Sequence, residues 1–220
     1  MSTAETSPRN FIPALGSHWL TPFYDGLSWL VGEQTIKRDL IRQARIVPGH
    51  DVLDLGCGTG TLALLVKEMH ADAHMVGVDI DPQILAIARA KIAAAGIDIR
   101  LVEGSATAPP LPDASFDRVL STLMLHHLTT PQKREALAAV RRLLRAGGEL
   151  HVADWGKPQN ALMALASLTF RLFDGEETTG ANLRGELPAL IAAAGFRDVV
   201  ETEHRMSPLG TVGFIRARAD

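Results

Sequence analysis

The chain has 220 residues, of which 46% are hydrophobic and 21% charged, a composition typical of one folded globular domain rather than of a disordered chain. Its 22 basic and 25 acidic residues leave a net charge of −3, so no basic surface indicates a nucleic-acid partner. The single cysteine, Cys57, excludes an internal disulfide bond and favours a reducing, cytoplasmic location. Residues 161–173, the most apolar stretch, are too few to cross a bilayer, so we expect no integral membrane segment.

The first two thirds of the sequence alternate between helical and strand patterns. Residues 1–48 are expected to form an N-terminal helical arm, whose apolar residues recur with helical spacing over 27–46. Short apolar runs then predict strands at 51–55, 75–79, 97–102, 116–122 and 149–153, with helices between them that include 82–95 and 131–145. Strands joined by helices need crossover connections, which predicts a mainly parallel sheet covered by helices on both faces.

The last third follows a different pattern. Residues 156–185 are expected to be an insertion that contains an apolar helix. A helix over 187–194 and two strands at 196–204 and 211–216, separated by the turn sequence SPLG, then predict a closing antiparallel hairpin. The expected fold is therefore α/β: a Rossmann-like, doubly wound, seven-stranded and mainly parallel sheet that occupies residues 49–220 as one domain after the helical arm.

A glycine-rich loop follows the first expected strand. Glycines at positions 56, 58 and 60 allow the backbone to turn tightly and to offer free N–H donors to a ligand. A dinucleotide site would carry its third glycine at position 61, where this sequence has Thr61. Asp54, just before the loop, would repel a pyrophosphate but suits a ligand with an ammonium group. Asp79, at the end of the second expected strand, can accept hydrogen bonds from ribose hydroxyls.

Several stretches together resemble the class I S-adenosylmethionine-dependent methyltransferases. They are VLDLGCGTG, GVDID, EGSA, SFDRVLSTLMLHHL and LLRAGGELHVAD, and they fall within residues 49–156. The arm (FYDGLSWLVGEQTIKRDLI) and the terminal AGF…SPLGTVGFIRAR are similar to those of the ubiquinone and menaquinone biosynthesis C-methyltransferases. The resemblance implies S-adenosyl-L-methionine as the cofactor and a small-molecule acceptor as the partner.

The resemblance also assigns residues to the cofactor. The complete set comprises Asp54, Gly56, Cys57, Gly58, Gly60, Asp79, Ile80, Ser105, Ala106 and Leu123. Many members of the family have an acid, which binds the adenine amino group, where this chain has Ser105, and a serine makes a weaker hydrogen bond than a carboxylate. Cys57 is expected to be a small filler rather than a nucleophile. Tyr24 in the arm would contact the cofactor or the acceptor, or alternatively pack in the interior.

His126, His127 and Asp154 are the candidate catalytic residues. Methyl transfer from a sulfonium is an in-line displacement, which needs a base only if the acceptor atom carries a proton. The histidines end the fourth expected strand and Asp154 ends the fifth, so an imidazole and this carboxylate can meet. Sugar O-methyltransferases with a similar LHH and AD pattern use such a pair, so the resemblance implies one here.

The alternative is that Leu-His-His-Leu only packs and that Asp154 caps a loop. If the pair acts as a base, His127→Ala and Asp154→Asn should each reduce turnover and leave cofactor binding intact. Adjacent side chains diverge in an extended chain, so we expect His126 and His127 to share no metal ion, and we expect no metal site.

The acceptor class is narrowed by what the sequence lacks. Enzymes that methylate nucleobase amines or glutamine amides carry an Asn/Asp-Pro-Pro-aromatic run after the fourth strand, where this chain reads STLM. The resemblance implies that residues 156–185 form a lid, whose apolar helix suits an apolar acceptor, a homodimer interface or a membrane surface. Two other functions stay open: a non-catalytic cofactor-binding protein of the same fold, and an NAD(P)-dependent oxidoreductase, which Thr61 and Asp54 disfavour.

Overall fold

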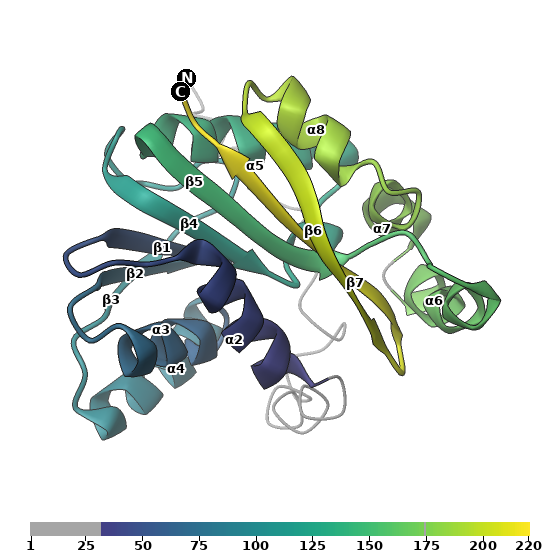
Figure 1. Ribbon diagram of the computed structural model, residues 1–220. Helices are drawn as coiled ribbons and strands as arrows, with labels where there is room; N and C mark the ends of the chain where they lie inside the picture. The colour runs from purple at the N-terminus through teal and green to yellow at the C-terminus, as the bar shows by residue number, and fades with distance from the viewer. Residues whose placement is uncertain (1–31, 174) are drawn as a thin grey trace, which may run out of the picture.

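The computed structural model of the protein describes residues 32–173 and 175–220 (Figure 1). Residues 1–31, which hold most of the expected arm and Tyr24, lie outside this description. Of the arm, the structure describes one helix, α2 (Glu33–Ala44). The buried residues of α2 include Ile36, Leu40 and Ile41, whose spacing forms a single apolar stripe that faces the sheet.

The elements that follow α2 alternate as the sequence predicts. The strands are β1 (Asp51–Leu55), β2 (His74–Asp79), β3 (Arg100–Glu103), β4 (Phe116–Thr122), β5 (Leu144–Trp155), β6 (Arg197–Ser207) and β7 (Gly210–Arg218). The α-helices are α3 (Thr61–Met69), α4 (Pro82–Ala95), α5 (Thr130–Leu143), α6 (Ala161–Phe173), α7 (Glu176–Leu183) and α8 (Leu187–Ala193), and a 3-10 turn, η3 (Leu125–His127), follows β4.

The described strands form one seven-stranded sheet in the order β3-β2-β1-β4-β5-β7-β6. The pairs from β3 to β5 are parallel, and β7 runs antiparallel to both of its neighbours. Figure 1 shows α2, α3 and α4 on one face of the sheet and α5 and α8 on the other. The expected doubly wound α/β fold with a closing hairpin is confirmed.

Each face of the sheet has its own apolar core, because successive side chains of a strand point to opposite faces. Val52 packs with α2 and α3, whereas Leu53 packs with α5 and α8, so Asp54 points to the α2 face. On β5, Val152 packs on the α5 face, and Asp154 shares that face. The two acids thus lie near the carboxyl ends of β1 and β5, which β4 separates, and they serve opposite faces of the sheet.

The boundary between α5 and β5 differs from the expectation. The sequence predicts a helix to residue 145 that stops at two glycines, but α5 ends at Leu143 and β5 begins at once. Leu144 already pairs with Phe116 on β4, and the two glycines lie inside β5, where their backbone exchanges hydrogen bonds with Ala219. The glycines therefore belong to an irregular strand and not to a helix stop.

The insertion and the hairpin are also more regular than the sequence indicates. Residues 156–185 hold two helices, α6 and α7, of which only the apolar α6 was expected. The hairpin strands extend until Ser207 pairs with Gly210, which leaves a turn of only Pro208 and Leu209. Within residues 32–173 and 175–220, no helix is long and apolar enough to span a membrane.

Candidate active site

The glycine-rich loop joins β1 to α3 at the point where the strand order reverses, which is where open α/β sheets bind their ligands. Gly56, Gly58 and Gly60 have φ angles of 75°, 53° and 76°, which side chains with a Cβ rarely adopt. A Cβ at Gly56 would lie 2.3 Å from Cγ of Met124. Both this clash and the positive φ therefore exclude a side chain at position 56. Around Gly58 no described atom comes within 4 Å of a Cβ position, which leaves the loop backbone open to a ligand.

Asp79 holds the loop from the end of the neighbouring strand. Its Oδ2 accepts a hydrogen bond from the backbone N–H of Gly58 at 2.9 Å, and its Oδ1 accepts from Asp81 at 3.0 Å. Burial raises the pKa of Asp79, and these backbone donors partly offset the effect. The adjacent Ile80 is 42% exposed, so its apolar side chain is free to pack against a flat ligand.

Asp54 is the most unusual group of the site, because it is buried and incompletely paired. The residue is 1% exposed, and its Oδ2 has no hydrogen-bond partner in the described part of the chain. Burial raises the pKa of Asp54 to about 7; Lys37 on α2 works against this rise and the charge of Asp79 adds to it. Asp54 precedes the loop directly in sequence, and Asp79 contacts the loop through the N–H of Gly58. A buried acceptor oxygen without a donor suits a cationic ligand group.

The other residues assigned to the cofactor lie along the same sheet edge. The backbone N–H of Gly104 donates to the carbonyl of Asp79 at 2.9 Å, which brings Ser105 and Ala106 beside the end of β2. The Ser105 hydroxyl lies 2.8 Å from the Thr107 hydroxyl and accepts the Thr107 N–H, so it is already engaged in its own loop. Leu123 follows β4 with a φ of 49°, a strained conformation for this residue type.

Cys57 lies inside the loop as a packed side chain. It is 5% exposed, and a Cβ at Gly77 of β2 would come within 2.9 Å of its Sγ. Burial, with Asp54 and Asp79 nearby, raises the pKa of the thiol far above its usual value. The thiol is therefore protonated at neutral pH, which does not suit a nucleophile.

His126 and Asp154 form a buried pair on the α5 face. The Nδ1 of His126 lies 2.7 Å from Oδ1 of Asp154, and the residues are 4% and 1% exposed. Asp154 also accepts the backbone N–H groups of Met124 and Trp155, at 3.2 Å and 2.7 Å. Burial alone would raise the pKa of Asp154, but His126, the N–H of Trp155 and Lys133 hold it below its usual value.

The geometry of the two histidines corrects the sequence expectation. They do not lie in an extended chain with diverging side chains: η3 winds them into one turn, closed by the His127 N–H on the Met124 carbonyl, and the ring centroids are 4.0 Å apart. The residue that pairs with Asp154 is His126. Burial, then His126 and Lys133, lower the pKa of His127 to about 3 against the opposing charge of Asp154. His127 is therefore a weak proton acceptor.

Sequence reasoning missed Lys133, which is fully buried next to this pair. Its Nζ donates to the carbonyl oxygens of Leu128 and Thr178. Burial lowers the pKa of Lys133 to about 8, although the charge of Asp154 acts in the opposite direction. A signal was present, because Lys133 stands three and four residues before Ala136 and Leu137 and so shares the apolar stripe of α5.

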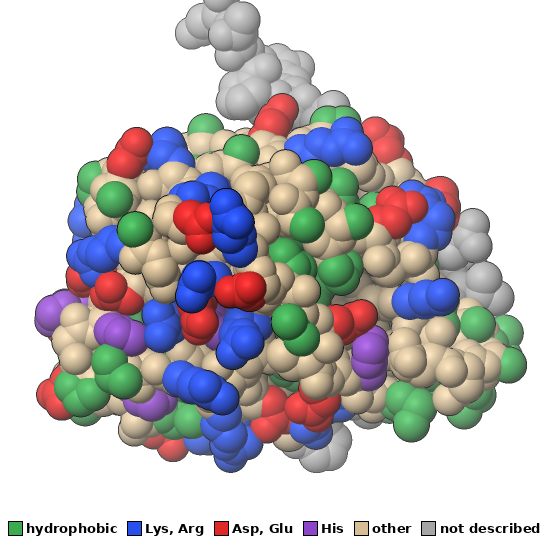
Figure 2. Space-filling model, turned by 45° about the horizontal axis from the view of Figure 1, so that its top comes forward, with side chains coloured by type: hydrophobic (Ala, Val, Ile, Leu, Met, Phe, Trp, Pro, Cys, Tyr) green, Lys and Arg blue, Asp and Glu red, His purple; other side chains and the backbone are tan. Residues whose placement is uncertain are grey.

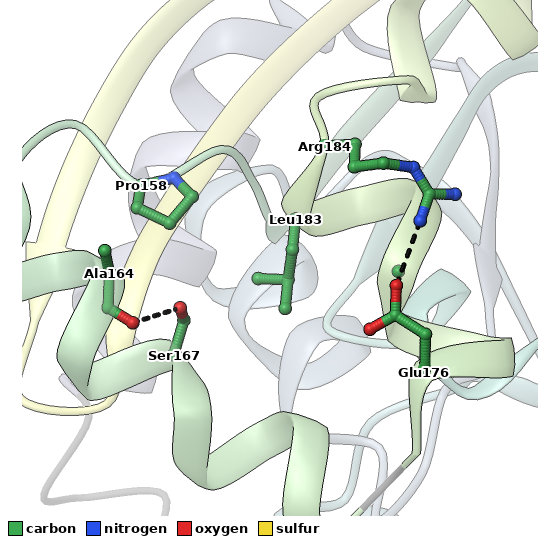
Figure 3. Close-up of a pocket in the computed structure, with 7 residues that line it drawn as sticks. Pro158, Ala164, Ser167, Glu176, Leu183 and Arg184 are labelled. Carbon is green, nitrogen blue, oxygen red and sulfur yellow. Dashed lines mark hydrogen bonds and ion pairs between the residues drawn. The ribbon is translucent and has the colours of Figure 1, made fainter.

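The insertion contains a separate cavity, between α6 and α7 (Figure 3). Its volume is about 290 Å³, and its lining residues are Pro158, Ala164, Ser167, Glu176, Gly180, Leu183 and Arg184. Arg184 Nη1 contacts Glu176 Oε1 at 3.0 Å, and the Ser167 hydroxyl donates to the Ala164 carbonyl at 2.8 Å. None of these residues belongs to the glycine loop or to η3. Across the described ranges, no group of His, Cys, Asp and Glu side chains is arranged to hold a metal ion.

Known proteins resemble this chain in sequence and in fold. The family model described as a methyltransferase domain matches residues 52–148. A demethylmenaquinone methyltransferase of Thermus thermophilus is 40% identical over 52% of this chain and 51% of its own length. An uncharacterized methyltransferase of Synechocystis is 29% identical over 86% of this chain and 85% of its own.

Solved structures share the architecture over a longer part of the chain. A phosphoethanolamine N-methyltransferase of Haemonchus contortus, in complex with phosphomonomethylethanolamine and S-adenosylhomocysteine, has a TM-score of 0.75 at 15% identity, over 92% of this chain and 58% of that chain. This likeness concerns the fold alone. The chain spans about half the length of the first curated relatives that it matches, at 51% of each.

Proposed function

We propose, from the match of residues 52–148 to a methyltransferase domain, that this protein transfers a methyl group from S-adenosyl-L-methionine to a small-molecule acceptor. The observation that carries the proposal is the pair of acids at the glycine loop. Among the described residues no group donates to the buried Oδ2 of Asp54, and Asp79 faces the same loop from the end of β2. An amino-acid ammonium group and a ribose diol are the complementary ligand groups.

The residues of the loop fit this cofactor. Asp54 would accept hydrogen bonds from the ammonium group, and the open backbone at Gly58 would face the methionine and ribose portions. Asp79 would accept from the ribose hydroxyls, and the exposed Ile80 would pack on the adenine. Ser105 and its neighbour would flank the adenine edge. When bound, the cofactor supplies an electrophilic methyl group on a sulfonium that leaves as a neutral thioether.

The chain's own contribution would be to orient the acceptor and to take up its proton. Asp154 fixes the ring of His126 through Nδ1, so that Nε2 becomes the proton-accepting atom. Asp154 is itself held by backbone donors, which keep the carboxylate in place without a mobile side chain. We therefore propose His126, and not His127, as the base for acceptors whose reacting atom carries a proton.

An apolar acceptor is the best-supported class. The relative from Thermus thermophilus is named for its action on demethylmenaquinone, and the insertion carries the apolar helix α6, on which Leu162 and Leu165 are 68% and 65% exposed. The same exposed face supports a homodimer.

Acidic and basic side chains are interspersed on the face shown in Figure 2, which favours a small-molecule partner over nucleic acid. The single reduced cysteine supports a cytoplasmic location.

Isothermal titration with three ligands tests the proposal. S-adenosylmethionine and S-adenosylhomocysteine are expected to bind and NAD is not, and Asp54→Asn is expected to weaken both sulfur ligands at least about tenfold. Asp72→Asn, which alters an exposed acid after α3, serves as the control. If neither sulfur ligand binds, the proposal fails. Transfer of an isotopically labelled methyl group into a pooled metabolite extract then separates an enzyme from a protein that only binds the cofactor.

A further inference from the structure

A lysine side chain lies completely buried beside the candidate active site. Lys133 is 0% exposed and stands at the fourth position of α5, where the positive end of the helix dipole disfavours a cation. Removal of an ammonium group from water is also unfavourable, and lysine is almost never fully buried unless it is paired. Neither the helix dipole nor the apolar core favours a cation at this position. The contacts of the ammonium group must therefore stabilise it.

The ammonium group joins two segments that are distant in sequence. Its Nζ donates to the carbonyl oxygen of Leu128, the residue directly after η3, and to the carbonyl oxygen of Thr178 in α7 at 2.5 Å. Hydrogen bonds from a charged donor are about twice as strong as neutral ones. Lys133 therefore fastens α7, a helix of the expected lid, to the turn that carries the two histidines.

The inner face of α7 has a second, uncharged anchor one turn further on. Asn182 is fully buried, and its Nδ2 donates to the backbone carbonyl of Trp155 at 3.1 Å. Thr178 and Asn182 are four residues apart, so they lie on the same side of the helix. Helix α7 thus packs on η3 and on the end of β5, the two segments that carry His126 and Asp154.

The charges around the lysine explain its protonation. Within the described part of the chain, Asp154 on β5 and His127 on η3 are the ionisable groups found to interact with Lys133, while α7 and the residue after η3 present backbone carbonyls. Burial lowers the pKa of Lys133 to about 8 in spite of Asp154. The group is thus mainly charged at neutral pH and loses its proton slightly above it.

We propose that Lys133 is a positioning residue, whose ammonium group holds α7 against the histidine turn and so closes the lid side of the active site. Closure in this place keeps water from the His126–Asp154 pair and fixes one wall of the acceptor site. The inference rests on the proposed function in so far as this region is an active site, but the attachment of α7 itself does not depend on any cofactor.

Hydrogen exchange of the unmodified, full-length chain at pH 7 and pH 9 gives the first test. After correction for the intrinsic pH dependence of exchange, opening of α7 is expected to increase about five- to tenfold at pH 9, because most of the lysine is then neutral. Helix α4, on the opposite face of the sheet, is the internal reference and should not change. If α7 shows no more pH dependence than α4, the inference is wrong.

Three variants give the second test. Lys133→Met removes the hydrogen-bond donor and should abolish the protection of α7 from exchange while the sheet stays protected. Lys133→Arg keeps a cation and should retain this protection, without the increase in exchange near pH 8. Arg134→Met removes the neighbouring exposed cation of the same helix and should behave as wild type. Unchanged α7 protection in Lys133→Met overturns the inference, and if that variant does not fold, the pH profile of the unmodified chain decides.

The failure of this inference is distinguishable from that of the proposed function. Titration of S-adenosylhomocysteine against the wild type tests the function, and an absence of binding there would leave the exchange result unaffected. Lys133 lies on the α5 face, opposite Asp54, so Lys133→Met should change the affinity for this ligand less than about twofold.

Discussion

Replacement of Asp54 by asparagine should separate the stability of the protein from its affinity for the cofactor. Burial raises the pKa of this carboxyl from 3.8 to about 7, with Lys37 opposing and Asp79 adding to the rise. Because the pKa of the native state is higher than that of the unfolded state, the native state holds the extra proton between about pH 4 and about pH 7. The free energy of unfolding therefore decreases as the pH rises through this window.

The magnitude follows from the size of the shift. One pKa unit corresponds to about 1.4 kcal/mol, so ionisation of Asp54 destabilises the cofactor-free protein by about 4 kcal/mol at pH 8. Asparagine carries no charge at any pH, so Asp54→Asn avoids this destabilisation. Its amide group needs a hydrogen-bond partner, however, which reduces the increase in the free energy of unfolding. We expect Asp54→Asn to be about 1–4 kcal/mol more stable than the wild type at pH 8 and nearly equal to it at pH 4.

Cofactor binding should respond in the opposite direction. The ammonium group of the cofactor needs the ionised carboxylate, so the affinity of the wild type should fall about tenfold per pH unit below pH 7. Urea denaturation followed by circular dichroism at the two pH values measures the stability, and isothermal titration measures the affinity. A variant that is less stable than the wild type at pH 8, or that binds the cofactor equally well, would refute the reasoning.

Three further outcomes follow from the site. Gly56→Ala should eliminate cofactor binding in titration and reduce the free energy of unfolding by at least about 2 kcal/mol, because its Cβ would meet Met124 and its φ is positive; near-normal binding would contradict this. His126→Asn should lower methyl transfer from labelled cofactor by about 10²-fold or more and His127→Asn by much less, so equal losses would count against His126 as the base. Cys57→Ala should retain turnover and lose about 1 kcal/mol in urea denaturation, whereas an inactive variant would indicate a chemical role for the thiol.

The sheet and the glycine loop could be predicted because their signals are local. β1 and β4 have the predicted bounds, because each carries a buried apolar pair, Val52–Leu53 and Val119–Leu120, in a short stretch between turns. The loop with Asp54 and Asp79 follows from chain order, because the carboxyl ends of parallel strands meet at one edge. The extra length of β5 could not be predicted, since glycines 147 and 148 are paired by the chain end, far away in sequence.

The roles of the His126–Asp154 pair and of α7 could be assigned only from the tertiary structure. The sequence placed an imidazole near Asp154, but the choice of His126 over His127 depends on the single 3-10 turn after β4. The apolar spacing of α5 places Lys133 on the buried side of the helix, but nothing local shows that α7 arrives to provide a carbonyl for it. These features are set by contacts between segments 28 and 45 residues apart.

The proposed function depends most on Asp54 as a buried carboxyl that receives the ammonium group of an adenosyl ligand. Carbon-13 NMR of the side-chain carboxyl, with and without S-adenosylhomocysteine, measures this most directly. We expect Asp54 to titrate near pH 7 in the free protein, and saturation with the ligand to move this titration at least about one pH unit lower. A titration that the ligand leaves unchanged would contradict this expectation.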